Sequence, residues 1–91
     1  MSVDITVQQT PNPNSLLFQV DRTVTEERMR QFNTADEAAG APLARSLFEI
    51  GGVASIFFMP QSITVSKDAG SEWDTIGPAA EAVIRSHFDE S

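Results

Sequence analysis

The 91-residue sequence is short, acidic and free of cysteine, with six basic against thirteen acidic residues and a formal net charge of −7. Nucleic-acid binding draws most of its affinity from lysine and arginine side chains that neutralise phosphates, so this composition argues against DNA and RNA partners. Without cysteine, these residues offer no disulfide, no thiol nucleophile and no thiolate ligand for a metal.

The first twenty residues predict an antiparallel hairpin. Apolar residues occupy every second position from Val3 to Val7, which is the period-two pattern of a half-buried strand. The two prolines of the Pro11–Asn14 segment then interrupt the strand, because proline lacks an N–H and favours extended geometry in the residue before it. The same alternation resumes from Leu16 to Val20, so the two strands are expected to pair around a stiff connection.

Two helices are predicted in the middle of the chain. Residues 22–32 are polar and weakly patterned, but Thr34–Glu37 has the spacing of a capping box and predicts a short helix that stops near Gly40. Pro42 suits the first turn of a second helix, where its missing N–H has no intrahelical partner in any case. Apolar residues follow at helical spacing until the Gly51–Gly52 pair ends the helix.

The last forty residues predict a second hairpin and a third helix. Val53–Met59 is a continuous apolar run, Pro60–Gln61 is a turn signal, and Ile63–Val65 alternates again. An apolar stripe at i, i+4 spacing runs from Ile76 to Phe88. The order ββααββα predicts a single α+β domain over residues 1–91, with an antiparallel sheet packed with three helices, mainly on one face.

Residues that carry chemistry are sparse. His87 is the sole histidine and lies near the end of the last helix, where a residue that complements the helix dipole is the simpler interpretation than a catalytic base. The carboxylates form short pairs without calcium-loop spacing, and the glycines do not form a phosphate loop. Trp73 is expected to anchor the last helix against the core, with ligand stacking as the alternative. We therefore expect no catalytic residue, no metal site and no cofactor.

A series of motifs runs along the whole chain: it begins with Thr10–Phe18 and continues, in order, through Pro42–Arg45, Leu47–Phe48, Gly52–Val53, Phe57–Phe58, Ile63–Val65 and Trp73 before the final helix. This series resembles the N-terminal domain of the Nfu/NifU-like iron–sulfur cluster scaffold proteins. In longer members of that family, a second domain with a Cys-x-x-Cys pair holds the cluster. The resemblance therefore implies an accessory or partner-recognition role in cluster assembly or delivery, without ligation of a cluster by these residues.

Four positions depart from the family pattern. The family usually has a lysine where Leu17 stands, a glycine where Met59 stands and an acidic residue where Gln61 stands. Ala41 stands where a serine commonly caps the second helix, which costs about 1 kcal/mol of capping if no other group accepts those N–H groups. We expect the turn after the Phe57–Phe58 pair to differ accordingly.

The sequence also indicates a candidate partner-binding surface. The asparagines of the proline-rich connection offer donors and acceptors that need not serve the sheet, although turn chemistry alone is the simpler explanation. Strand parity places Leu17 on the face opposite Phe18, where it forms an exposed patch with Phe57 and Met59, or with Phe58, unless a helix covers that face. The predicted partner-binding residues are Asn12, Pro13, Asn14, Leu17 and, as a carboxylate-binding neighbour, Arg45.

Three classes of function remain open at this stage. The chain is a non-catalytic protein-interaction module of iron–sulfur biogenesis, a stand-alone adaptor for an unrelated protein partner, or, least in keeping with its residues, an enzyme or direct metal binder. The amino terminus has no basic region before an apolar stretch, and no apolar run approaches membrane-spanning length. We therefore expect a cytoplasmic protein with protein partners, no membrane or nucleic acid, and a monomer or weak homodimer.

Overall fold

The computed structural model describes residues 3–26 and 28–89 and shows a five-stranded antiparallel sheet with two helices in those ranges. The α+β class and the two predicted hairpins are confirmed, whereas the order ββααββα and the count of three helices are wrong. The elements in chain order are β1 (Ile5–Gln9), β2 (Ser15–Val20), β3 (Arg30–Phe32), α1 (Pro42–Phe48), β4 (Val53–Met59), β5 (Ser62–Lys67) and α2 (Trp73–Asp89).

The predicted first helix at Thr34–Gly40 is a run of turns instead. One bond of the capping box forms, since the Glu37 N–H donates to Thr34 Oγ1 (3.2 Å), but Glu37 Oε2 accepts from the N–H of Asn33 (3.3 Å), the residue before Thr34. The backbone bonds that follow mostly span three residues, and Gly40 and Pro42 stop further propagation. A capping box satisfies a helix terminus, but it does not offset the cost of nucleating so short a helix.

The segment that showed little pattern, residues 22–32, contributes the short strand β3. Gln31 pairs with Phe57 and Phe32 pairs with Ile56, so β3 adds to the edge of the sheet beyond β4. A three-residue strand is too short to reveal a period, which is why the sequence pattern missed it. Its pairing partner lies more than twenty residues away in the chain, and this long-range contact selects the strand.

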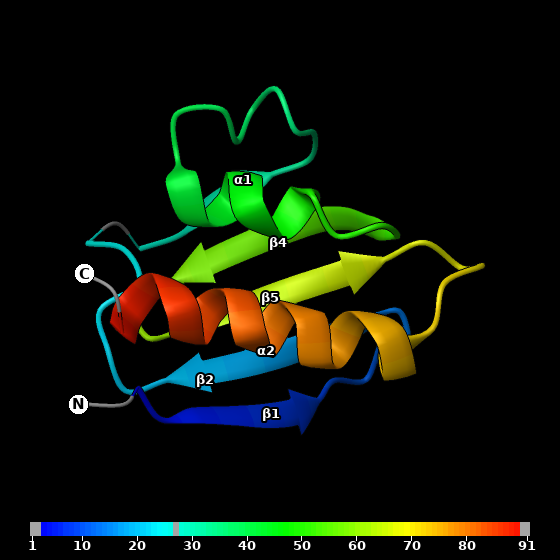
Figure 1. Ribbon diagram of the computed structural model, residues 1–91, viewed down its shortest axis with the longest axis horizontal. Helices are drawn as coiled ribbons and strands as arrows, with labels where there is room; N and C mark the ends of the chain where they lie inside the picture. Colours follow the sequence, from blue (N-terminus) through cyan, green and yellow to red (C-terminus); the bar gives the residue numbers. More distant parts are fainter. Residues whose placement is uncertain (1–2, 27, 90–91) are drawn as a thin grey trace.

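The sheet has the order β1-β2-β5-β4-β3, and every neighbouring pair is antiparallel. The two hairpins therefore join through β2 and β5 at the centre. Figure 1 shows both helices on one face of the sheet, with α2 in front of β5 and β2 and α1 beside β4. The strand β1 lies beyond the edge of α2. None of the helices formed by the described residues is long and apolar enough to cross a membrane.

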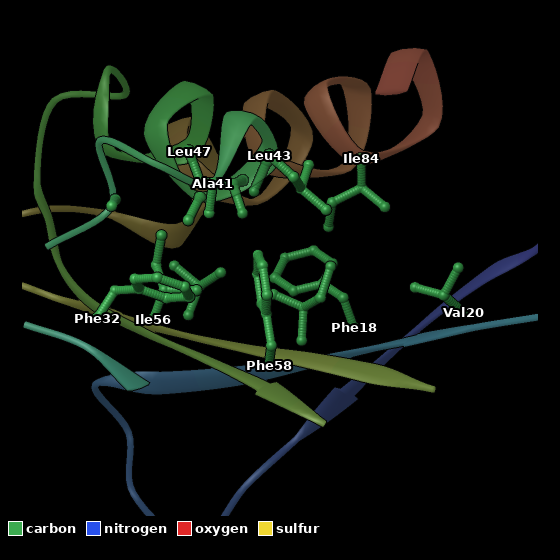
Figure 2. Packing of buried hydrophobic residues seen from close by; sticks show 14 of the residues in the cluster. Phe18, Val20, Phe32, Ala41, Leu43, Leu47, Ile56, Phe58 and Ile84 are labelled. Atoms are coloured by element: carbon green, nitrogen blue, oxygen red, sulfur yellow. The ribbon is translucent and has the colours of Figure 1, made fainter. Parts of the chain in front are cut away.

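The hydrophobic core lies between the helices and the sheet. Figure 2 shows Leu43, Leu47 and Ile84 pointing from the helices toward Phe18 and Phe58 of the strands. All of these side chains are buried. The rings of Phe58 and Phe32 meet edge to face with centroids 5.2 Å apart, a geometry that their quadrupoles favour.

The helix α1 begins as the sequence suggested, but without a side-chain cap. Pro42 occupies its first turn, and Ala41 at the N-cap makes no side-chain hydrogen bond to the helix. The Ala41 side chain is instead buried in the core cluster. Packing has therefore replaced capping at this position.

Candidate functional site

The connection between β1 and β2 is a tightly bonded loop. The hydroxyl of Thr10 lies 2.9 Å from the carbonyl oxygen of Asn12 and 3.0 Å from that of Ser15, and it accepts a bond from the Asn12 N–H. Asn12 Oδ1 accepts the N–H of Asn14 at 2.9 Å, the bond that defines an Asx turn. These bonds fix the shape of the loop and hold its prolines at the surface.

Two long-range contacts fasten the loop to the rest of the domain. Lys67 of β5 donates its backbone N–H to Asn14 O (2.8 Å), and its Nζ donates to Asn14 Oδ1 (3.3 Å). The indole Nε1 of Trp73 donates to the Pro13 carbonyl at 3.0 Å. Trp73 is the first residue of α2, so this bond ties the start of the helix to the loop.

Loop, sheet edge and helix enclose a shallow groove, which we call the Trp73 groove. Two adjoining hollows of about 550 Å³ and 320 Å³ form it. Both hollows are lined by Val7, Leu16 and Trp73. The remaining lining residues are Gln9, Thr10, Pro11, Asn12, Pro13 and Ser15 in the first hollow and Gly77, Pro78 and Glu81 in the second. Its lining combines apolar and aromatic side chains with polar ones, which is the usual composition of a site that binds another molecule.

The structure brings together three of the five residues predicted for partner binding. Asn12 and Pro13 line the Trp73 groove, and Asn14 holds the same loop in place. The side-chain oxygens of both asparagines accept bonds within the domain, whereas their NH₂ groups donate to none of the described residues. A turn bond therefore uses the oxygen of Asn12 and a bond from Lys67 uses that of Asn14, while the donor half of each amide stays available.

Leu17 lies on a different surface. It is half-buried on the face of the sheet that carries neither α1 nor α2, and it pairs with Gln8 and Thr64. Phe57 pairs with the other side of Thr64 on that same face, whereas Phe58 points into the core. The structure thus decides between the two predicted patches in favour of Leu17, Phe57 and Met59.

Arg45 is not a neighbour of the proline-rich loop. It is exposed on α1, which packs beside the end of α2 that carries Ala82 and Ser86. The loop contacts Trp73 at the other end of α2, about nine residues and therefore about 13 Å away along the helix axis. The structure shows no contact between Arg45 and the two asparagines, and their cooperation in binding one partner stays a prediction.

The described residues form no cluster of metal-binding or catalytic side chains. No three histidine, aspartate or glutamate side chains among residues 3–26 and 28–89 lie close enough to hold a metal ion. His87 is exposed in the last turn of α2, with its ring edge to face against Phe88. Each buried polar side-chain atom in this part of the chain has a hydrogen-bond partner. The described residues therefore present no assembled acid, base or nucleophile.

Sequence reasoning missed Val7 and Leu16 as members of the groove. Both alternate as core residues of a strand, and Ile5 beside them does pack against the core. Val7 is nevertheless 44% exposed, because β1 lies beyond the cover of α2. The position of a strand within a sheet depends on long-range pairing, and no local pattern in residues 3–20 carries that signal.

The fold and surface define a small α+β domain with a surface groove and a sheet face that carries neither helix. A family profile described as "Scaffold protein Nfu/NifU N terminal" matches residues 5–91, and the chain belongs to this family. It is 45% identical over 85 residues to the human protein "NFU1 iron-sulfur cluster scaffold homolog, mitochondrial", an alignment that covers 92% of this chain and 34% of that protein. It is 36% identical over 84 residues to "NifU-like protein 4, mitochondrial" of Arabidopsis thaliana, covering 92% of this chain and 30% of the relative. The chain thus spans about a third of these relatives.

Solved structures agree with the fold. The solution structure of a NifU-like protein from Saccharomyces cerevisiae superimposes with a TM-score of 0.87, at 22% identity over 99% of this chain and 82% of that one. The crystal structure of protein SAV1430 from Staphylococcus aureus has a TM-score of 0.79 at 25% identity, covering 89% of this chain and 98% of that one. These likenesses support the arrangement of strands and helices.

Proposed function

We propose that this chain is a non-catalytic partner-recognition domain of iron–sulfur cluster biogenesis that does not itself ligate a cluster. The observation that carries the proposal is a family match over residues 5–91 in a sequence without cysteine. The matched relatives are named as iron–sulfur cluster scaffolds. Thiolates are the standard ligands of such clusters, so these residues serve the process by binding proteins rather than iron.

The binding surface of this proposal is the Trp73 groove together with its loop. Pro13 and Asn12 stand at its rim, and the donor groups of Asn12 and Asn14 are available to carbonyl or carboxylate oxygens of a partner. Leu17 and Arg45 belong to two further surfaces, which a large partner can reach separately. The surface is small for a protein interface, so the proposed complexes are transient.

Three further features belong to the proposal. The domain acts as a monomer or weak homodimer, because its net charge of −7 opposes self-association. Its partners are iron–sulfur assembly proteins or the apo-proteins that receive clusters, and not nucleic acid or membranes. We place the chain in the cytoplasm, whereas the relatives named above carry the word mitochondrial. Fractionation of cells that express the tagged chain tests this location.

Affinity capture from the chain's own cell extract tests the function. The proposal predicts that proteins that assemble or receive iron–sulfur clusters are enriched, and that Trp73→Ala reduces their recovery several-fold while the variant stays folded. Met29→Ala serves as the matched surface control, since Met29 is 55% exposed and directly precedes β3, at the sheet edge opposite β1. Enrichment of unrelated proteins alone supports the second candidate, an adaptor outside iron–sulfur biogenesis, and contradicts the proposal.

A further inference from the structure

The outer edge of β1 presents unpaired backbone groups, and the register with β2 shows which residues carry them. The Asp21 N–H donates to Asp4 O at 3.1 Å, and the register continues from this pair along β1 and β2. On the other side of β2, the Val20 N–H donates to Gln61 O (2.9 Å). Because hydrogen-bonded and non-bonded pairs alternate in an antiparallel ladder, Thr6 and Gln8 bond to β2. The N–H and C=O groups of Ile5, Val7 and Gln9 therefore point away from the sheet.

The two edges of the sheet differ in their protection. The edge strand β3 has only three residues and carries Arg30, and short length and charge are common means of preventing edge-to-edge pairing. The edge strand β1 has five residues, ITVQQ, without charge or proline. No strand among the described residues pairs with its outer side. Of the two edges, β1 is the one suited to accept another strand.

Apolar side chains lie beside this edge of the sheet. Val7 pairs with Phe18 and therefore faces the helix side of the sheet, where it lines both hollows of the Trp73 groove. Its backbone groups point sideways beyond β1, and its side chain stands on the helix side of the same strand. A strand added there places alternate side chains against Val7, Trp73 and Pro78, which supply apolar contacts next to the backbone bonds.

The charge of the groove restricts the occupant. Of the described residues that line the two hollows, Glu81 alone is charged, and the sequence as a whole carries a net charge of −7. An extended segment with a lysine or arginine opposite Glu81 is attracted, and an acidic segment is repelled. A second copy of this chain fits poorly, since pairing two β1 edges joins two acidic molecules and leaves each Glu81 without a cation.

We propose that β1 accepts an extended, basic segment of a partner protein as a sixth strand, whose side chains enter the Trp73 groove. This inference rests on the partner-recognition role proposed above and specifies how the groove is used. Backbone bonds to Ile5, Val7 and Gln9 supply affinity that does not depend on sequence. Glu81 and the apolar side chains of the groove select segments that combine a cation with alternating apolar side chains.

A library of random displayed dodecapeptides, selected against the immobilised chain, tests the inference. The peptides enriched are expected to be basic with alternating apolar residues. Val7→Pro removes an outward N–H without touching the bonds to β2, and we expect it to weaken binding of the best peptide at least tenfold. Val7→Thr keeps the N–H and the branched side chain, so it separates the side-chain contribution from the backbone bond, and we expect it to weaken binding less than Val7→Pro does. Glu81→Gln is expected to weaken binding several-fold and to reduce its salt dependence.

Amide hydrogen exchange on the wild-type complex gives the second measurement and does not depend on the folding of any variant. Exchange at Ile5, Val7 and Gln9 is expected to slow at least tenfold with bound peptide. Selection of no binder, equal binding to a folded Val7→Pro, unchanged exchange at these amides, or a homodimer through β1 in sedimentation each overturn the inference. Captured cluster-assembly proteins that bind Val7→Pro normally would overturn this inference alone and leave the proposed function standing.

Discussion

The two faces of the sheet differ in their cover, and the neighbouring residues Leu17 and Phe18 show the difference. Phe18 is fully buried beneath the helices, whereas Leu17, one position earlier on β2, is half-buried on the face without helices. Both are large apolar side chains, and strand geometry alone sends them in opposite directions. Residue type therefore does not tell which of the two side chains belongs to the core. The alternation of side chains along the strand does.

The open face is also unusual in its chemistry. A row of register partners crosses all five strands there, and none of its members is charged: Gln8, Leu17, Thr64, Phe57 and Gln31. The helix-covered face carries the core. This uncharged row lies in a sequence whose net charge is −7, so the charged residues are located elsewhere on the domain. The core side fixes the fold, whereas the open face carries neither helix and the outer side of β1 pairs with no strand among the described residues.

The largest expected effect is on the covered face. Phe18→Ala removes a fully buried ring and leaves a cavity between β2 and the helices, so we expect a loss of about 3–5 kcal/mol in the free energy of unfolding. Chemical denaturation followed by far-UV circular dichroism measures this change. A loss below about 1 kcal/mol would show that Phe18 is not a core residue and would remove the contrast with Leu17.

Substitution of Gly52, just before β4, is expected to have an intermediate effect on the free energy of unfolding. Gly52 has φ +99°, and a Cβ there would lie 2.7 Å from Ser71 Cβ and 3.0 Å from Ile76 Cδ1. Gly52→Ala therefore combines a left-handed backbone with a clash at the start of α2, and we expect about 1–3 kcal/mol of destabilisation. Gly51→Ala is the matched control, since nothing lies within 4 Å of its added Cβ. Equal denaturation midpoints for the two variants would contradict this packing.

A substitution in the loop between β1 and β2 is expected to lower the stability less. Asn12→Ala deletes the acceptor of the Asn14 N–H, and we expect a loss of about 0.5–1.5 kcal/mol, because the exposed donor can turn to water. Thermal unfolding measures the stability, and capture of partners measures the function. The donor half of the amide predicts weaker capture beyond what the stability change explains. Reduced stability with unchanged capture of every partner would contradict a binding role for this asparagine.

The smallest effect on stability is expected on the open face. Leu17→Lys keeps an aliphatic stem on the sheet and exposes its charge to water, so the free energy of unfolding should change by less than about 1 kcal/mol. Partner capture or self-association through Leu17 should weaken, since burying a leucine contributes about 1.5–3 kcal/mol. Thermal unfolding beside Phe18→Ala provides the comparison. A large loss for Leu17→Lys would show that this face is covered and that its leucine is core.

Much of the fold follows from local pattern, and the failures have physical causes. The two hairpins and both helices that form were visible because each has a strong period or a clear breaker, such as Pro42 before α1 or Pro60 between β4 and β5. The helix expected at Thr34–Gly40 failed because a capping signal does not measure helix length. The strand β3 was missed because only its pairing with β4 defines it.

The candidate site was predictable only in its local part. The Pro11–Asn14 loop announced itself through proline and asparagine, and strand parity placed Leu17 correctly on the face opposite Phe18. The groove could not be found in this way, because Trp73 meets Pro13 across sixty residues of chain. The sequence could not place Arg45 relative to the loop for the same reason, since proximity between α1 and the loop depends on tertiary packing.

The central claim is that this domain serves iron–sulfur biogenesis through proteins and without holding a cluster. Anaerobic reconstitution of the purified chain with ferrous iron and sulfide, followed by desalting and iron and sulfide analysis, tests it most directly. The account predicts a colourless protein with substoichiometric iron and with ferrous affinity no tighter than about millimolar, because thiolates are absent and the carboxylates are dispersed. A stable cluster with visible charge-transfer absorption and stoichiometric iron and sulfide would contradict it.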